Sequence, residues 1–213
     1  MVERIPKSLL LTYKVMRLDI QIIVDLVGAG QRVLDIGCGD GVLLGRLREE
    51  KHVDARGMDV HLESVQACVQ KGLAVIQGDA NQDLGDYPDQ SFDWVILSQT
   101  LQAMQRPDDI MRHLVRIGRR VVVSIPNFGY WKVRLFLLLR GRMPVSKFLP
   151  YQWYDTPNIH LCTVRDFIAL CQDQGIVLER LIPLTPSGTY DRSFWADHLM
   201  NWAAEQAVFV VRG

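Results

Sequence analysis

The stretch Val33-Leu34-Asp35-Ile36-Gly37-Cys38-Gly39-Asp40-Gly41 decides the fold of this chain. A short apolar run that contains one acid predicts a buried strand, and three glycines at alternate positions follow it. The chain then continues with the helical pattern of Val42, Leu43, Leu44 and Leu47. Glycine adopts conformations that other residues avoid and lets the backbone approach a ligand closely. Because open α/β sheets bind ligands at the carboxyl ends of their strands, the stretch predicts a ligand-binding loop.

The spacing of the three glycines argues against a dinucleotide. A dinucleotide fingerprint has the pattern G-x-G-x-x-G, whose third glycine permits close packing of helix and strand. Counted from Gly37, that third position is Val42, whereas the third glycine of this chain comes one residue earlier, at Gly41. Asp35 would also lie unfavourably beside a pyrophosphate. In a partly buried cleft, this acid suits a ligand that carries a positively charged amino group.

Two further acids follow predicted strands. Arg56-Gly57-Met58-Asp59-Val60 has the pattern of a second strand end, and a third strand over 73–77 is followed by Gly78-Asp79-Ala80. An acid at the end of the second strand of such a sheet often accepts hydrogen bonds from both hydroxyls of a ribose. Either acid alone would be an ordinary turn former, since aspartate favours turns. Three acids at the ends of successive strands favour a cofactor site instead.

The segment Asp35-Ile36-Gly37-Cys38-Gly39-Asp40-Gly41 resembles motif I of the class I S-adenosylmethionine (SAM) methyltransferases. This resemblance implies that the ligand is SAM or its product S-adenosylhomocysteine. It also implies that the Asp79 side chain accepts from the adenine amino group and that the Ala80 N–H donates to the ring. The cofactor-binding residues expected on this basis are Asp35, Gly37, Cys38, Gly39, Gly41, Asp59, Val60, Asp79, Ala80 and Ser98.

Strands alternate with helical patterns along the chain, which is typical of a parallel α/β sheet. Later strands are predicted at 92–97, 120–125, 176–183 and 207–212, and helices near 16–26, 63–70 and 108–117. Thr163 can cap another helix, which has Asp166 at its third position and ends at Gly175. We expect a single Rossmann-like domain over 1–213 with helices on both faces. The order resembles the methyltransferase sheet of seven mostly parallel strands, in which the last strand is antiparallel.

The composition narrows the class of protein. The chain has 213 residues with 24 Lys+Arg and 24 Asp+Glu, so no overall charge favours nucleic acid as a partner. The longest apolar run, Leu135 to Leu139, is far shorter than the ~20 residues of a membrane span, and the first residues lack a signal-peptide pattern. The four cysteines form no C-x-x-C pair, which favours reduced thiols in the cytoplasm, and no histidine spacing indicates a metal site.

The segment 128–158 departs from a minimal methyltransferase. Apolar residues from Trp131 to Leu139 alternate with cations, and five cations with no acid lie between Lys132 and Lys147. An aromatic cluster follows at 151–154. A basic amphipathic helix can lie on a membrane or dock on a partner, and it can equally be a lid whose apolar side packs on the core. We favour a lid or docking surface over membrane contact, because an apolar helix side packs more often than it inserts.

The same region carries a second, more specific resemblance. Three stretches are similar to the methionine-biosynthesis family MetW: Ser124-Ile125-Pro126-Asn127-Phe128-Gly129, Leu138-Leu139-Arg140-Gly141-Arg142-Met143-Pro144 and Pro150-Tyr151-Gln152-Trp153-Tyr154-Asp155-Thr156-Pro157-Asn158-Ile159-His160. The similarity extends from about Met16 to Pro183. The resemblance implies a class I methyltransferase fold and association with a homoserine O-acyltransferase, MetX, some members of which depend on MetW. The 128–158 segment is the site that we expect for this association.

The sequence offers no recognisable catalytic base, so the catalytic residues stay unassigned. After the fourth strand the chain reads Leu97-Ser98-Gln99-Thr100-Leu101-Gln102, without the Asp/Asn-Pro-Pro-Tyr/Phe of enzymes that methylate amino groups. Gln99 and Gln102 can hydrogen-bond a ligand but cannot act as bases near neutral pH. His160 is the best-placed remaining base, although a lone histidine before a helix is more often structural. No serine has the G-x-S-x-G context of an acyltransferase nucleophile.

Two functions therefore remain open. The first is a SAM-binding subunit that activates or regulates homoserine O-acyltransferase in methionine biosynthesis. The second is an active SAM-dependent methyltransferase that acts on an unidentified small molecule. The basic, apolar insert favours the first, and the three acids are compatible with both.

Overall fold

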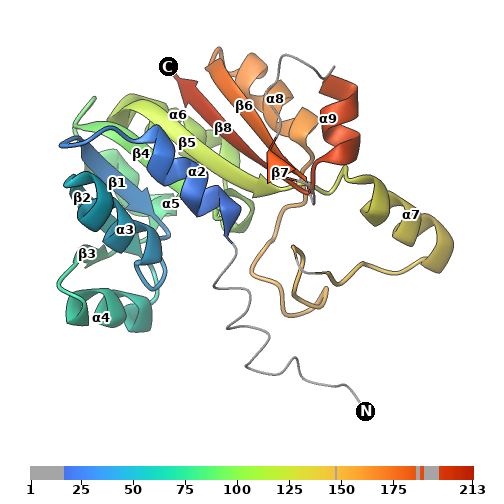
Figure 1. Cartoon of the computed structure of the whole chain (residues 1–213), viewed down its shortest axis with the longest axis horizontal. Coiled ribbons are helices and arrows are strands. Elements are labelled where there is room, and N and C mark those ends of the chain that lie inside the picture. Colours follow the sequence, from blue (N-terminus) through green and yellow to red (C-terminus); the bar gives the residue numbers. More distant parts are fainter. Residues whose placement is uncertain (1–16, 147, 186–187, 190–196) are drawn as a thin grey trace.

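The computed structural model describes residues 17–146, 148–185, 188–189 and 197–213, so Met16 and Lys147 lie outside the described residues. One mixed sheet with the order β3-β2-β1-β4-β5-β8-β6-β7 runs through the centre of the molecule (Figure 1). The strands are β1 (Arg32–Ile36), β2 (Asp54–Asp59), β3 (Ala74–Gln77), β4 (Phe92–Ser98), β5 (Gly118–Pro126), β6 (Val177–Thr185), β7 (Gly188–Thr189) and β8 (Gln206–Arg212).

The first five strands are parallel, and β8 pairs antiparallel with both β5 and β6. This confirms the predicted class I methyltransferase sheet of seven strands with an antiparallel last strand. The two-residue strand β7 is an addition at the β6 edge that the sequence analysis did not predict. Parallel pairing of β1 to β5 places the carboxyl ends of these strands at one edge, which is where the candidate site residues follow.

Helices cover both faces because successive side chains of a strand point to opposite sides. Along β5, Val122 packs with α2 and α3, whereas Val121 and Val123 pack with α6 and α8 on the other face. The helices are α2 (Leu18–Leu26), α3 (Val42–Lys51), α4 (Leu62–Gln70), α5 (Ala80–Asp83), α6 (Pro107–Ile117), α7 (Trp131–Arg140), α8 (Val164–Asp173) and α9 (Asp197–Ala203), with 3-10 turns at Leu84–Asp86 and Leu101–Ala103.

The predicted cap of α8 is confirmed. The Thr163 hydroxyl accepts from the Asp166 N–H at 3.3 Å, and the Asp166 carboxylate accepts from the Thr163 N–H at 2.9 Å, a reciprocal capping box. The short helices α5 and α9 were not predicted. Helix α7 extends away from the sheet (Figure 1), and Val133 is its buried residue. No helix in the described part of the chain is long and apolar enough to cross a membrane.

Candidate functional site

The glycine loop joins β1 to α3 at the carboxyl edge of the sheet. Gly37, Gly39 and Gly41 all have positive φ angles, +70°, +56° and +75°, which residues with a Cβ rarely adopt. At Gly37 a Cβ would also come within 2.5 Å of the Thr100 side chain, so this position is closed by packing. At Gly39 no atom of the described residues lies within 4 Å of the position that a Cβ would take. The loop therefore leaves open space above Gly39, where a ligand can meet the backbone.

Asp59 braces this loop from the end of β2. Its Oδ2 accepts from the Gly39 N–H at 2.8 Å and its Oδ1 accepts from the His61 N–H at 2.9 Å. The Gly37 and Cys38 N–H groups donate to the Met58 carbonyl, at 2.8 and 3.2 Å. Each carboxylate oxygen has a second lone pair, so Asp59 can still accept from two hydroxyls. The geometry thus fits the ribose role predicted from the sequence, which stays a prediction.

Asp35 is the most informative side chain of the site. It lies in β1, is 2% exposed, and its Oδ1 has no hydrogen-bond partner among the described residues. Burial raises the pKa of Asp35 to about 7; the charge of Arg17 opposes this rise and that of Asp59 adds to it. A buried carboxylate without a partner is costly, and a cation removes that cost. The site therefore fits a ligand that brings a positively charged amino group.

Asp79 and Ala80 continue the same edge beyond β3. The Gly78 N–H donates to the Asp59 carbonyl at 3.1 Å, which connects the two turns. Asp79 caps α5, and its carboxylate accepts from the N–H and side chain of Asn81 at 2.9 and 2.8 Å. The backbone hydrogen bond from Asn81 is the main reason that the pKa of Asp79 is lowered. Ala80 begins α5, so its N–H belongs to the first-turn donors that have no partner within a helix.

The remaining predicted residues frame these acids. Val60 is exposed, and its carbonyl accepts from the Gln77 side chain at 3.3 Å. Cys38 is buried, and its burial raises the pKa of its thiol; the charge of Asp35 raises this pKa further. The thiol therefore stays protonated, and Cys38 acts as a packing residue. The Cys68 thiol donates to the Gly39 carbonyl at 3.2 Å and holds the loop from α4.

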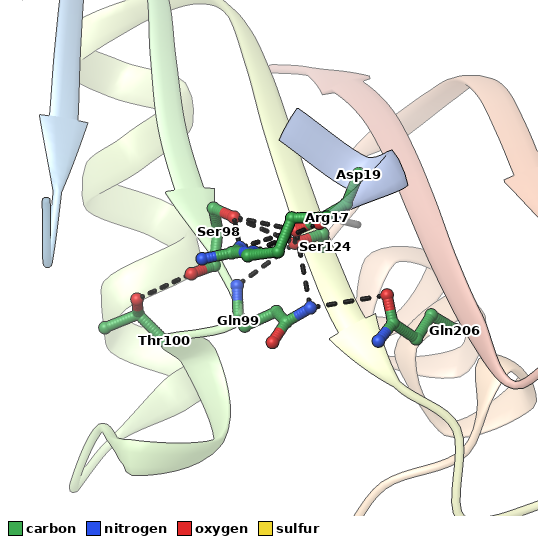
Figure 2. A network of polar contacts seen from close by, with 7 residues as sticks. All are labelled: Arg17, Asp19, Ser98, Gln99, Thr100, Ser124 and Gln206. Carbon is green, nitrogen blue, oxygen red and sulfur yellow. Dashed lines mark hydrogen bonds and ion pairs between the residues drawn. The ribbon is translucent and has the colours of Figure 1, made fainter. Parts of the chain in front are cut away.

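Ser98 lies in a different environment, a buried polar network at the ends of β4 and β5. Figure 2 shows side chains from the start of α2, from β4, β5 and β8 turned toward one another. Asp19 is 1% exposed and pairs with Arg17 at 2.6 Å, while the hydroxyls of Ser98 and Ser124 donate to it at 3.0 and 3.1 Å. Burial alone would raise the pKa of Asp19. The hydrogen bond and charge of Arg17, together with the hydrogen bonds from the Ser98 and Ser124 hydroxyls, outweigh burial and lower this pKa.

This network was not among the features predicted from the sequence. The signal was an aspartate directly before the apolar pattern of Ile20, Ile23 and Val24, which places Asp19 next to the side of α2 that faces the sheet. The network occupies the Ser98 hydroxyl with Arg17 and Asp19, and a role of Ser98 in binding a cofactor stays a prediction.

The two glutamines that follow β4 are both held by the protein. Gln99 has a positive φ angle of 57°, and its side-chain amide donates to Asp19 at 3.4 Å and to Gln206 at 3.3 Å. Gln102 is 2% exposed, and its amide donates to the Pro126 carbonyl and the Cys162 sulfur. His160 is exposed, with its ring 3.4 Å from the Gln105 carbonyl. Among the described residues, no three His, Cys, Asp or Glu side chains gather as a metal site would require.

The chain is similar to proteins of a known family. The family described as "Methionine biosynthesis protein MetW" matches residues 17–211. The chain belongs to the MetW family. A curated relative from Rhodopirellula baltica, the bifunctional methionine biosynthesis protein MetXA/MetW, is 31% identical over 173 residues, or 77% of this chain. The aligned part is only 28% of that relative, so this MetW chain corresponds to a fraction of the bifunctional protein.

Solved structures share the fold of this MetW chain at low sequence identity. A SAM-dependent methyltransferase from Archaeoglobus fulgidus superposes with a TM-score of 0.67 at 15% identity, covering 94% of both chains. A Haemonchus contortus phosphoethanolamine N-methyltransferase in complex with SAM has a TM-score of 0.61 at 14% identity, covering 92% of this chain and 51% of the enzyme. These similarities confirm the class I methyltransferase fold.

Proposed function

We propose that this MetW protein binds SAM and associates with a homoserine O-acyltransferase of the MetX type, whose activity it supports. The single observation that carries the proposal is the Rhodopirellula baltica relative, which is named for MetXA and MetW together. Joining two proteins in one polypeptide raises their effective concentration for each other, which matters only when the two act together. Separate chains of the same two kinds are therefore expected to associate. The four cysteines are unpaired in the structure, which favours work in the reducing cytoplasm.

The cofactor part of the proposal rests on the unpaired Asp35. When SAM is bound, its sulfonium supplies a transferable methyl group or, in a regulatory role, a recognisable charge. Asp35 would hold the amino group, Asp59 the ribose hydroxyls, and Asp79 with Ala80 the adenine. Gly39 would provide the open backbone for the ligand, because no side chain of the described part of the chain fills the space above it.

The post-β4 residues favour a binding role over catalysis. Methyl transfer to a protonated nucleophile needs a base that is positioned at the acceptor. Gln99 and Gln102 are amides that the protein holds through its own hydrogen bonds. The alternative function, an active SAM-dependent methyltransferase for an unidentified small molecule, is favoured by the complete set of acids at the cofactor edge.

One experiment separates the two functions. The acylation rate of the homoserine O-acyltransferase from the same genome is measured alone, with wild-type protein, and with Asp59→Ala, each with and without SAM. Asp86→Ala is the matched control, because Asp86 is an exposed acid outside the site. We expect the wild type and Asp86→Ala to raise the rate and Asp59→Ala to lose any SAM effect. No complex and no change in rate would overturn the activator function, and Asp59-dependent methylation of an acceptor by the chain alone would establish the enzyme.

A further inference from the structure

Helix α7 presents its apolar side chains to solvent. A surface helix normally buries an apolar stripe against the core. In α7 the opposite holds: Leu138 is 81% exposed, Leu139 is 71% exposed, and Leu135, Phe136 and Leu137 are also exposed. A contiguous apolar patch of this kind marks an interaction site, whereas single exposed apolar residues need no explanation. The helix therefore has the composition of a buried element, and no described residue of the chain covers its leucines.

A pocket of about 250 Å³ lies at the root of α7. It is larger than a cavity of ~150 Å³, which accepts a benzene molecule, so an aromatic or large aliphatic side chain can enter it. Phe136 and Val145 line it and are themselves exposed, which connects the pocket with the apolar surface of α7. Its other apolar walls are Tyr130, Val133, Pro144, Phe148 and Leu149.

The base of this surface is held rigidly. Asn127 is 2% exposed and satisfies four backbone groups: its amide donates to the Asn201 and Ala204 carbonyls, and its oxygen accepts from the Gly129 and Val164 N–H groups. Trp131, the first residue of α7, stacks on Trp202 of α9 with ring centroids 5.7 Å apart. A surface that is ordered before binding loses less conformational entropy when a partner docks.

Unpaired cations flank the apolar surface. Arg140 and Arg142 follow Leu139, and neither has an ion-pair or hydrogen-bond partner among the described residues. Arg134 is different, because its Nε donates to the Gly129 carbonyl at 2.6 Å and so supports the root of the helix. A partner that covers Leu138 and Leu139 is thus expected to bring carboxylates to Arg140 and Arg142.

We propose that α7 and the pocket at its root form the docking surface for a protein partner that inserts one apolar side chain into the pocket and places carboxylates beside Arg140 and Arg142. The proposal rests on the proposed function in one respect: it takes the homoserine O-acyltransferase as that partner. A pocket for one side chain, next to exposed leucines and arginines, matches the energetic centre of a protein interface. A lipid surface would use the leucines and arginines but has no rigid side chain to enter the pocket, so the pocket favours a protein partner.

The test measures the affinity of the purified chain for the acyltransferase from the same genome by calorimetry. Three variants change the surface: Leu138→Glu places an acid in the apolar patch, Val145→Trp fills the pocket, and Arg140→Glu with Arg142→Glu reverses the flanking charge. Matched controls are Val69→Glu, an apolar residue of α4 that is 57% exposed, and Lys51→Glu at the end of α3. Thermal unfolding with and without SAM verifies that every variant is folded and binds the cofactor like the wild type.

We expect each surface variant to weaken the complex about ten-fold or more, because residues at the centre of an interface have effects of this size, and each control to stay within about two-fold of wild type. Wild-type binding that all three variants retain would overturn this surface and leave the proposed function standing. A wild type that forms no complex would overturn both. A parallel experiment measures binding to phosphatidylcholine/phosphatidylserine vesicles. If Leu138→Glu abolishes vesicle binding and leaves the affinity for the acyltransferase unchanged, the surface binds lipid and the proposal is overturned.

Discussion

Replacing Asp35 by Asn should stabilise the ligand-free protein and at the same time remove most of its affinity for SAM. The carboxylate is 2% exposed, and its Oδ1 has no partner among the described residues. Folding therefore places it in a setting where its charged form is disfavoured until a ligand brings a cation. Asn has nearly the same shape and no charge, so the substitution removes the unfavourable term and the attraction to the ligand together.

The direction and size of the stability change in Asp35→Asn follow from the pKa of Asp35. Burial raises it from 3.8 to about 7, so the folded protein holds this proton more tightly than the unfolded chain does. Stability from this group is complete below pH ~4, falls as the pH rises toward 7 and is lost above it. At ~1.4 kcal/mol per pH unit, the loss is about 4 kcal/mol as an upper limit. Because the Asn amide is itself a buried polar group, we expect a gain of roughly half this value, or about 5 °C in unfolding temperature at pH 8.5.

The assay is thermal unfolding at pH 5.5 and 8.5, with and without SAM, for wild type, Asp35→Asn and the exposed control Asp86→Asn. Asp35→Asn should exceed the wild type at pH 8.5 by several times the difference at pH 5.5, and SAM should raise the unfolding temperature of the wild type and the control but not of Asp35→Asn. The reasoning is wrong if Asp35→Asn unfolds at or below the wild-type temperature at pH 8.5 and responds to SAM as strongly as the wild type.

Three further predictions concern the fold around the site. Asp19→Ala removes the buried partner of Arg17 and should lower the free energy of unfolding by about 3 kcal/mol in urea titrations. Because the pKa of Asp19 is lowered, the wild type should lose stability from this group as the pH falls below ~4, and the variant should lose less stability over this pH range. Asn127→Ala removes the partner of four buried backbone groups and should lower the free energy of unfolding by about 3 kcal/mol or more in the same assay, with Asn81→Ala, on the partly buried α5, as a milder comparison. Gly39→Ala has open space for its methyl group, so only the positive φ angle of residue 39 should lower the stability, by ~1–2 kcal/mol. The same variant should weaken SAM binding at least ten-fold in calorimetry, and an affinity for SAM equal to that of the wild type would show that the ligand does not approach this residue.

Much of the fold could be predicted because local signals and the sheet agree. The glycine loop, the apolar run of β5 and the Thr163 cap each specify one arrangement, and the structure has all three. The acids at 35, 59 and 79 could be predicted as a group for the same reason: parallel strands bring their carboxyl ends to one edge. Periodicity and turn chemistry are local, so they are readable before the tertiary structure is known.

The features that could not be predicted depend on contacts distant in sequence. The Asp19 network joins residues 105 positions apart, from Asp19 to Ser124; the local pattern of α2 places Asp19 beside the sheet but does not identify its partners. Gln102 looks like a candidate ligand contact in the sequence, but its amide is used by Pro126 and Cys162. Helix α7 has an apolar pattern that is typical of a packed helix, and only the three-dimensional structure shows that its leucines face solvent.

The pKa of Asp35 depends on Arg17, which also forms an ion pair with Asp19. Arg17 lowers the pKa of Asp35 through its charge, yet its guanidinium is bonded to Asp19 at 2.6 Å and to the Ser98 hydroxyl. The network thus satisfies Asp19 fully and leaves Asp35 only partly compensated. Moving Arg17 from Asp19 to Asp35 would break the ion pair of a carboxylate that is 1% exposed, and breaking such buried pairs costs about 3–5 kcal/mol. The buried carboxylate of Asp35, by contrast, is stabilised when a ligand brings a cation next to it. An amino group of the ligand is therefore expected to stabilise Asp35, and this expectation holds for both proposed functions.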